Sequence, residues 1–131
     1  MDARPFALLF ALSLAAASFP EPRNNQPETI PLLKSADALT KLHLPEGFRA
    51  TLFAAEPDVR QPIALCWDER GRLWIAENYT YADGKERFDL KLRDRIIILE
   101  DADHDGKFDK RTVVTEDVQM LTSIERGLGG V

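Results

Sequence analysis

The chain is organised around one stretch, which reads Arg95-Ile96-Ile97-Ile98-Leu99-Glu100 and continues as Asp101-Ala102-Asp103-His104-Asp105-Gly106-Lys107-Phe108-Asp109. The first half is a short run of mainly β-branched apolar residues, which predicts a buried strand. The second half places carboxylates at alternate positions and then a glycine where the chain must turn. This pattern is typical of a loop that wraps oxygen ligands around a hard cation such as Ca²⁺.

The candidate metal ligands are Asp101, Asp103, Asp105 and Asp109. Counted from Asp101, the spacing follows an EF-hand loop as far as the glycine, but the twelfth position is a threonine instead of a bidentate glutamate. Because both flanks are predicted strands, a shorter D-x-D-x-D-G-x-x-D calcium loop between two strands fits better. The alternative is a solvated acidic turn without an ion. Crowded carboxylates repel one another without a cation, which favours Ca²⁺.

Short apolar runs separated by turns continue on both sides of this stretch. We expect strands at 48–55, 63–67, 73–77, 95–100 and 112–115. The turn at 68–72 contains Gly71, which can supply a positive φ. The last four strands predict an up-and-down antiparallel meander. In such a meander the 68–72 turn and the 101–110 loop lie at one end, and the 78–94 connection lies at the other.

The predicted fold class is all-β, specifically a partial β-propeller. A single four-stranded sheet cannot cover both of its apolar faces, whereas a propeller packs about 4–8 such sheets around a channel. Flanking strands are expected at 48–55, from an adjoining blade, and in the strand-like material at 121–131. A small β-sandwich or barrel is the competing interpretation, but the chain offers too few strands for it. We expect a fragment that does not fold independently.

The N-terminal region predicts export. Arg4 precedes an apolar run over 5–17 that ends in three alanines, which indicates a signal peptide at 1–17. The run is too short for a transmembrane helix, which needs about 20 residues. The expected location is therefore periplasmic, cell-surface or secreted. Residues 18–46 read as a linker with a short helix at about 35–42, and residues 47–131 as the start of an incomplete propeller domain.

Several other features limit the possible functions. A net charge of −5 without a Lys/Arg cluster argues against nucleic-acid binding. Cys66 is the only cysteine, so the chain has neither an intrachain disulfide nor a haem-attaching C-x-x-C-H, and a core thiol is expected. His43 and His104 are expected at the surface.

The long 78–94 connection is the second candidate site. It carries aromatic and basic side chains, namely Tyr79, Tyr81, Lys85, Arg87 and Phe88. They could contact a sugar, a quinone or a partner domain. A mobile surface loop is the equally weighted alternative.

Four motifs occur in a fixed order: Leu44-Pro45-Glu46-Gly47-Phe48, Phe53-Ala54-Ala55-Glu56-Pro57, Trp67-Asp68-Glu69-Arg70-Gly71-Arg72-Leu73-Trp74-Ile75-Ala76-Glu77-Asn78 and Ile98-Leu99-Glu100-Asp101-Ala102-Asp103-His104-Asp105-Gly106. Together, over about residues 35–131, they resemble the N-terminal part of the "membrane-bound dehydrogenase" propeller domain of large exported proteins from planctomycetes and verrucomicrobia. The resemblance implies a propeller similar to those of soluble quinone-dependent sugar dehydrogenases. It also implies helical repeats and a c-type haem domain downstream in the same protein.

The implied function is oxidation of a sugar or alcohol, with electrons passing to a quinone or c-type haem located elsewhere. No residue of this chain is assigned a catalytic role. The alternative is a non-enzymatic, calcium-stapled propeller that binds carbohydrate or protein at the cell surface.

Overall fold

The computed structural model describes residue 29, residues 31–81 and residues 87–131. These residues form one short helix and four strands: α1 (Ser35–Leu39), β1 (Pro62–Trp67), β2 (Leu73–Glu77), β3 (Asp94–Glu100) and β4 (Lys110–Val118). The mostly β content confirms the predicted all-β class. The predicted signal peptide at 1–17 and the first part of the linker lie outside the described residues.

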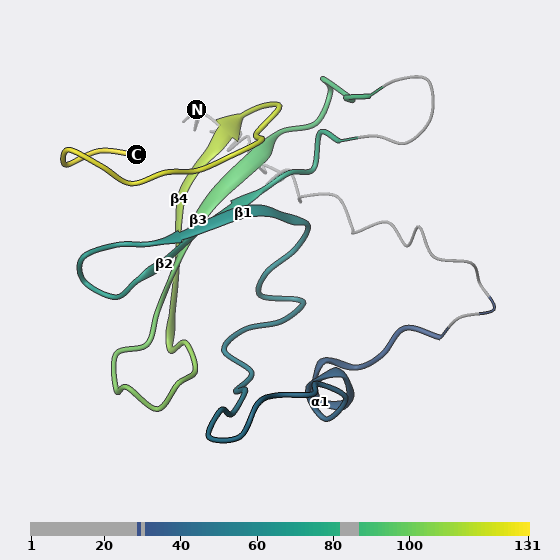
Figure 1. Ribbon diagram of the computed structural model, residues 1–131. Coiled ribbons are helices and arrows are strands. Elements are labelled where there is room, and N and C mark those ends of the chain that lie inside the picture. Colours follow the sequence, from purple (N-terminus) through teal and green to yellow (C-terminus); the bar gives the residue numbers. More distant parts are fainter. Residues whose placement is uncertain (1–28, 30, 82–86) are drawn as a thin grey trace, which may run out of the picture.

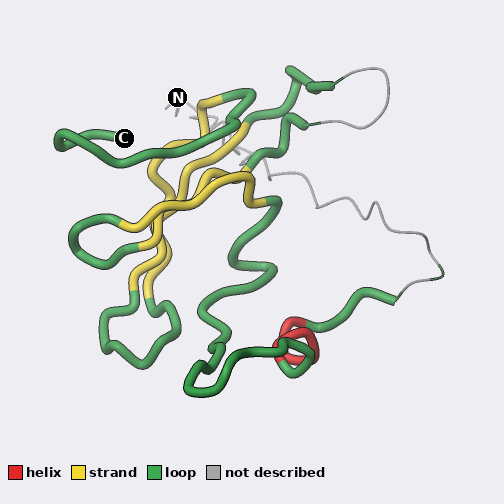
Figure 2. Tube along the Cα trace, viewed as in Figure 1, coloured by secondary structure: helices red, strands yellow, loops and turns green. Residues whose placement is uncertain are grey.

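The four strands form one open antiparallel sheet in the order β1-β2-β3-β4 (Figures 1 and 2). Each strand pairs with the next along the chain, so that Ile75 in the middle of β2 lies opposite Leu65 on one side and Ile97 on the other. This is the meander that the sequence predicts. The observed β4 is longer than the predicted 112–115, at nine residues.

Alternation of side chains along β2 and β3 builds an apolar cluster on each face of the sheet. The first cluster consists of Leu73, Ile75, Ile97 and Leu99, with Phe53, Ala54, Val59 and Phe108 packed against it. The second consists of Trp74, Ala76, Ile98 and Ile124, with Ala64, Cys66, Ile96 and Leu121 packed against it. Different flanking segments therefore contribute to the two faces: residues 53–59 to the first and residues 121–124 to the second.

The prediction of a strand at 48–55 is wrong, because this segment is irregular throughout. A strand needs a partner along its length for its N–H and C=O groups. Here the segment packs Phe53 and Ala54 onto a face of the sheet, and the Phe53 carbonyl accepts a hydrogen bond from the Phe108 N–H at 3.3 Å. Tertiary packing of its apolar side chains has replaced pairing.

The second predicted flanking strand, at 121–131, is also absent from the structure. This segment is irregular, packs Leu121 and Ile124 onto the second cluster, and ends in a tight turn in which Gly127 and Gly130 exchange backbone hydrogen bonds. The helix is shorter than the expected 35–42. None of its residues is buried, and a helix this short has little to sustain it without packing.

Much of the apolar surface of β1 stays exposed. Ile63, Leu65 and Trp67 alternate along the strand and are 51%, 58% and 56% exposed. Beside them, a groove of about 460 Å³ lies between residues 51–59 and strands β1 and β2. Within the described residues, no helix has the length and apolar character needed to cross a membrane.

The connections lie at the ends that the meander predicts (Figure 1). The 68–72 turn and the 101–109 loop share one end of the sheet, and the connection from β2 to β3 lies at the other. Gly71 has a φ of +73° and supplies the positive φ expected in the turn.

Candidate functional site

The loop that joins β3 to β4 gathers three of the predicted ligands. Asp101, Asp103 and Asp109 each offer a carboxylate oxygen, and these three oxygens lie within 4.8 Å of one another. Because Ca²⁺ binds oxygen at about 2.3–2.6 Å, ligands on opposite sides of one ion are separated by about 5 Å. The spacing and the all-oxygen donor set therefore fit a single hard cation.

Asp105, the fourth predicted ligand, lies outside this group of three. Its Oδ1 accepts a hydrogen bond from the Lys107 N–H at 2.8 Å. Backbone N–H groups also hold the loop closed: Gly106 donates to Asp101 Oδ2 at 2.9 Å, and Ala102 donates to Asp109 Oδ2 at 2.7 Å. The turn is thus shaped by hydrogen bonds that backbone N–H groups donate to the carboxylates.

The acidic loop is attached to the segment that crosses the first face of the sheet. The rings of Phe108 and Phe53 lie 6.5 Å apart, and Phe53 also meets Trp67 edge-on at 5.6 Å. His104, within the loop, is exposed, as is His43, which agrees with the surface positions predicted for both.

In the 78–94 connection, the predicted candidate residues differ in how far they are exposed. Tyr79 is buried, with only 3% of its surface exposed, so it cannot serve as a contact residue for a ligand in solution. Tyr81 is 61% exposed and meets Phe88 edge-on at 6.2 Å, where the two arms of the connection form an isolated bridge. Arg87 is exposed, and Lys85 lies outside the described residues.

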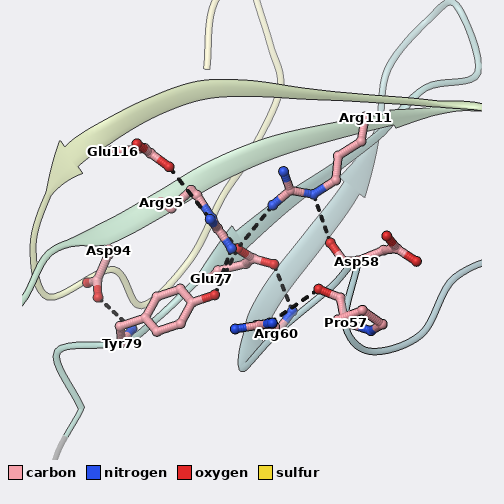
Figure 3. Close-up of polar contacts among 9 residues, drawn as sticks. All are labelled: Pro57, Asp58, Arg60, Glu77, Tyr79, Asp94, Arg95, Arg111 and Glu116. Atoms are coloured by element: carbon pink, nitrogen blue, oxygen red, sulfur yellow. Dashed lines mark hydrogen bonds and ion pairs between the residues drawn. The ribbon is translucent and has the colours of Figure 1, made fainter. Parts of the chain in front are cut away.

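Tyr79 belongs to a buried polar network centred on Glu77, which is fully buried (Figure 3). Glu77 accepts hydrogen bonds from the Arg95 guanidinium at 2.5 Å and from the Tyr79 hydroxyl at 3.3 Å. Arg95 also donates to the Tyr79 hydroxyl at 2.7 Å. Burial, assisted by the nearby charge of Glu77, raises the pKa of Tyr79 to about 12.

The same carboxylate ties a flanking loop to the sheet. Glu77 Oε1 accepts a hydrogen bond from the Arg60 N–H at 2.7 Å, and Arg111 Nε donates to the Asp58 carbonyl at 2.8 Å (Figure 3). Residues 58–60 are therefore held against β2 and β4 by charged side chains of the sheet.

Asp94 is a second buried carboxylate, at the start of β3. Its Oδ1 accepts hydrogen bonds from the N–H groups of Tyr79 and Thr80, each at 2.7 Å. Its Oδ2 accepts from the Thr80 hydroxyl at 2.9 Å and from the Leu121 N–H at 2.8 Å. One side chain thus joins both arms of the 78–94 connection to the segment that follows β4.

Asp68 is the third buried carboxylate and lies at the start of the 68–72 turn, directly after β1. Its oxygens accept hydrogen bonds from Trp74 Nε1 at 2.9 Å and from the Arg72 N–H and Nε at 2.9 and 2.8 Å. Burial by itself raises the pKa of Asp68, but the hydrogen bonds from Trp74 and Arg72 outweigh it and hold the pKa well below its usual range. The 68–72 turn is therefore fixed by a charged group within it.

These three acids were not among the sites that sequence reasoning selects. Asp68, Glu77 and Asp94 each lie at the end of an apolar strand, which is also where an exposed acid is expected. Their partners are distant in sequence: Leu121 lies 27 residues after Asp94. Because every one of them has several hydrogen-bond donors, they act as structural acceptors, and within the described residues none is a buried base without a partner.

Cys66 is half-buried and packs against the second apolar cluster, which agrees in part with the predicted core thiol. Burial, together with the charge of Glu125, raises the pKa of the Cys66 thiol. A raised pKa disfavours the thiolate, so the residue is not an activated nucleophile.

Fold and site together define the class: a mostly β protein with a four-stranded antiparallel meander and a carboxylate-rich loop between its last two strands. The chain belongs to the family described as "Domain of unknown function (DUF7133)", whose sequence model matches residues 34–131. No curated protein and no solved structure matches the chain. The matched range contains the whole sheet and the acidic loop.

Proposed function

We propose that this chain forms one blade of a β-propeller in an exported dehydrogenase, and that Ca²⁺ at the acidic loop fastens the blade. The observation that carries the proposal is the complete four-stranded meander with apolar side chains on both faces. Neighbouring sheets in a propeller would cover the exposed side chains of β1 and the apolar groove beside them. The resemblance described above supports the dehydrogenase assignment.

The calcium part of the proposal is supported by the geometry of Asp101, Asp103 and Asp109. Three carboxylates so close together repel one another, and a divalent cation removes that repulsion. The bound ion would stiffen the turn between β3 and β4 at the end of the sheet opposite the 78–94 connection. Its role would be structural.

Calorimetric titration of the intact protein with Ca²⁺ tests this part. We expect binding with a dissociation constant of about 10⁻⁴–10⁻³ M, as in extracellular calcium modules. Asp103→Asn should remove the binding heat. Asp105→Asn, in the same loop but outside the group of three, should retain it and is the matched control. Absence of heat and of a thermal shift at millimolar Ca²⁺ in the unmodified protein would rule the site out.

The c-type haem that the resemblance implies does not fit the residues of this chain. Covalent c-type haem attachment needs two cysteines and a histidine in C-x-x-C-H, and Cys66 is the only cysteine. No step of a reaction is therefore assigned to these residues. In the intact enzyme, this blade would contribute to the scaffold and, through the exposed Tyr81 and Arg87, to the face on which the 78–94 connection lies.

Dye-linked oxidation of a panel of sugars and alcohols by the intact protein, with and without added quinone, tests the enzymatic part. Quinone-dependent turnover of at least one substrate is expected. If no substrate is oxidised while the panel binds, the non-enzymatic propeller is the correct assignment. The specific observation favouring that second candidate is that Asp68, Glu77 and Asp94, the buried carboxylates among the described residues, all accept hydrogen bonds, so none of them is a buried base without a partner.

A further inference from the structure

The turn in the acidic loop contains the sequence Asp105-Gly106, which is susceptible to a chemical rearrangement of the backbone. Gly106 has a φ of +89°, a left-handed conformation that side chains with a Cβ rarely adopt. Glycine is therefore required after Asp105. A glycine nitrogen is also the least hindered backbone nitrogen for attack on the preceding aspartate side chain.

That attack is a defined reaction that needs only water. The Gly106 nitrogen bonds to Cγ of Asp105, one carboxyl oxygen leaves as water, and a cyclic succinimide forms. Water then opens the ring, and opening at the α-carbonyl leaves the main chain running through Cγ. The product is isoaspartate, which has the same mass as aspartate but one extra methylene group in the backbone.

In the structure, both reacting groups are already engaged. The Gly106 N–H donates to Asp101 Oδ2 at 2.9 Å, and the Asp105 carboxylate accepts from the Lys107 N–H at 2.8 Å. The nucleophilic nitrogen and the carboxyl group that it would attack thus have different partners. Asp105 itself is exposed, so solvent water is available for both steps.

We propose that Asp105–Gly106 is a latent isoaspartate site and that the Asp101 carboxylate suppresses the reaction by holding the Gly106 N–H. Asp101 therefore has a role besides that of a candidate ligand. An added backbone methylene between Asp105 and Gly106 would disrupt the hydrogen bonds that close the turn.

The test is ageing of the intact protein at 37 °C in a chelator, with peptide mapping and enzymatic methylation of isoaspartyl residues as readouts. Asp101→Ala should increase the rate of isoaspartate formation at Asp105 about fivefold to tenfold, the factor that one net hydrogen-bond free energy represents. Asp101→Asn, which keeps an acceptor oxygen, should stay near the rate of the unmodified protein.

Asp103→Ala is the matched control. It removes a carboxylate of the candidate calcium site but leaves the Gly106 to Asp101 hydrogen bond, so its rate should stay within about twofold of the unmodified protein. Equal acceleration by Asp103→Ala and Asp101→Ala would overturn the proposal. Because the measurement is made without Ca²⁺, a failed calcium titration would leave its outcome unaffected. Circular dichroism of each variant separates this local effect from unfolding.

Discussion

At the scale of single residues, the structure depends on buried acids whose side chains accept several hydrogen bonds. Asp68 is the clearest case: its side chain is fully buried and bonds to Arg72 and Trp74. A buried carboxylate is stabilising only when its lone pairs are satisfied. Asp68 and Trp74 therefore work as a unit, because the acid and the indole that donates to it meet across the 68–72 turn.

Replacing Asp68 by asparagine should destabilise the intact protein by about 1–3 kcal/mol at pH 7, because charge-assisted hydrogen bonds become neutral ones. The folded-state pKa of Asp68 is lowered, so its contribution is present above the unfolded pKa of about 3.9 and is lost as pH falls below it. Urea unfolding of both proteins between pH 3 and 7 should show the difference shrinking with acid. Glu69→Gln, at the exposed neighbour, is the control and should change little.

Tyr79 should contribute to the loss of stability of the folded protein at alkaline pH. Its pKa is raised to about 12 in the folded protein, so its contribution is present below the unfolded pKa of about 10 and is lost as pH rises towards 12. The protein should lose on the order of 2 kcal/mol of unfolding free energy over this range from Tyr79 alone. Tyr79→Phe should lack that component. Equal losses in the two proteins would contradict the assignment.

At the scale of elements, the two ends of the sheet are fastened differently. The end with the acidic loop relies on local hydrogen bonds within 101–109, whereas the other end relies on Asp94, which joins segments distant in sequence. The connection from β2 to β3 is thus anchored at both of its arms.

Substitution of Asp94 by alanine should destabilise the end of the sheet at which the connection from β2 to β3 lies. It leaves the buried N–H groups of Tyr79 and Thr80 and the partly buried N–H of Leu121 without an acceptor, at a total cost of about 3 kcal/mol or more. Hydrogen exchange measured by mass spectrometry should show faster exchange in peptides containing those amides. Asp89→Ala removes a carboxylate of the same connection that accepts a hydrogen bond from the exposed Lys91 N–H, which is none of those amides, and should leave them protected.

At the scale of the whole molecule, the exposed apolar side chains of Ile63, Leu65 and Trp67 alternate along β1. The exposed side chains of β1 and the adjacent groove form a continuous strip beside the first cluster. Under the proposed function, another part of the protein would cover this strip. In a propeller, that part is the neighbouring blade.

Leu65→Lys tests whether this strip is covered in the intact protein. Leu65 is 58% exposed in this chain, so a lysine would cost little if the strip faced water. If another sheet covers it, the substitution should lower stability by at least about 2 kcal/mol, because apolar burial is lost and a charge is buried. Leu42→Lys, at a residue 54% exposed outside the sheet, is the matched control. Equal effects in a thermal denaturation experiment would contradict the blade.

Local sequence patterns were sufficient to predict the four strands of the sheet and the location of the acidic loop. Alternating apolar runs, the Gly71 turn and the Asp-Gly spacing are local signals, and local sterics and side-chain alternation are sufficient to produce them. The meander follows because strands that are consecutive in sequence usually pair, and here they do so even across the long 78–94 connection. The three gathered carboxylates were predictable for the same reason, since all belong to one short loop.

Long-range packing, in contrast, sets the paths of 48–55 and 121–131 and the roles of Asp68, Glu77, Asp94 and Tyr79. The structure also shows that three of the four candidate carboxylates lie close together and that Asp105 lies outside this group. Segment 48–55 has the composition of a strand, but it packs Phe53 on a face of the sheet and does not pair as a strand. Whether a strand-end acid faces water or accepts a distant N–H depends on which segments fold over it. That information is carried by long-range contacts, such as the one between Asp94 and Leu121, and no local pattern contains it.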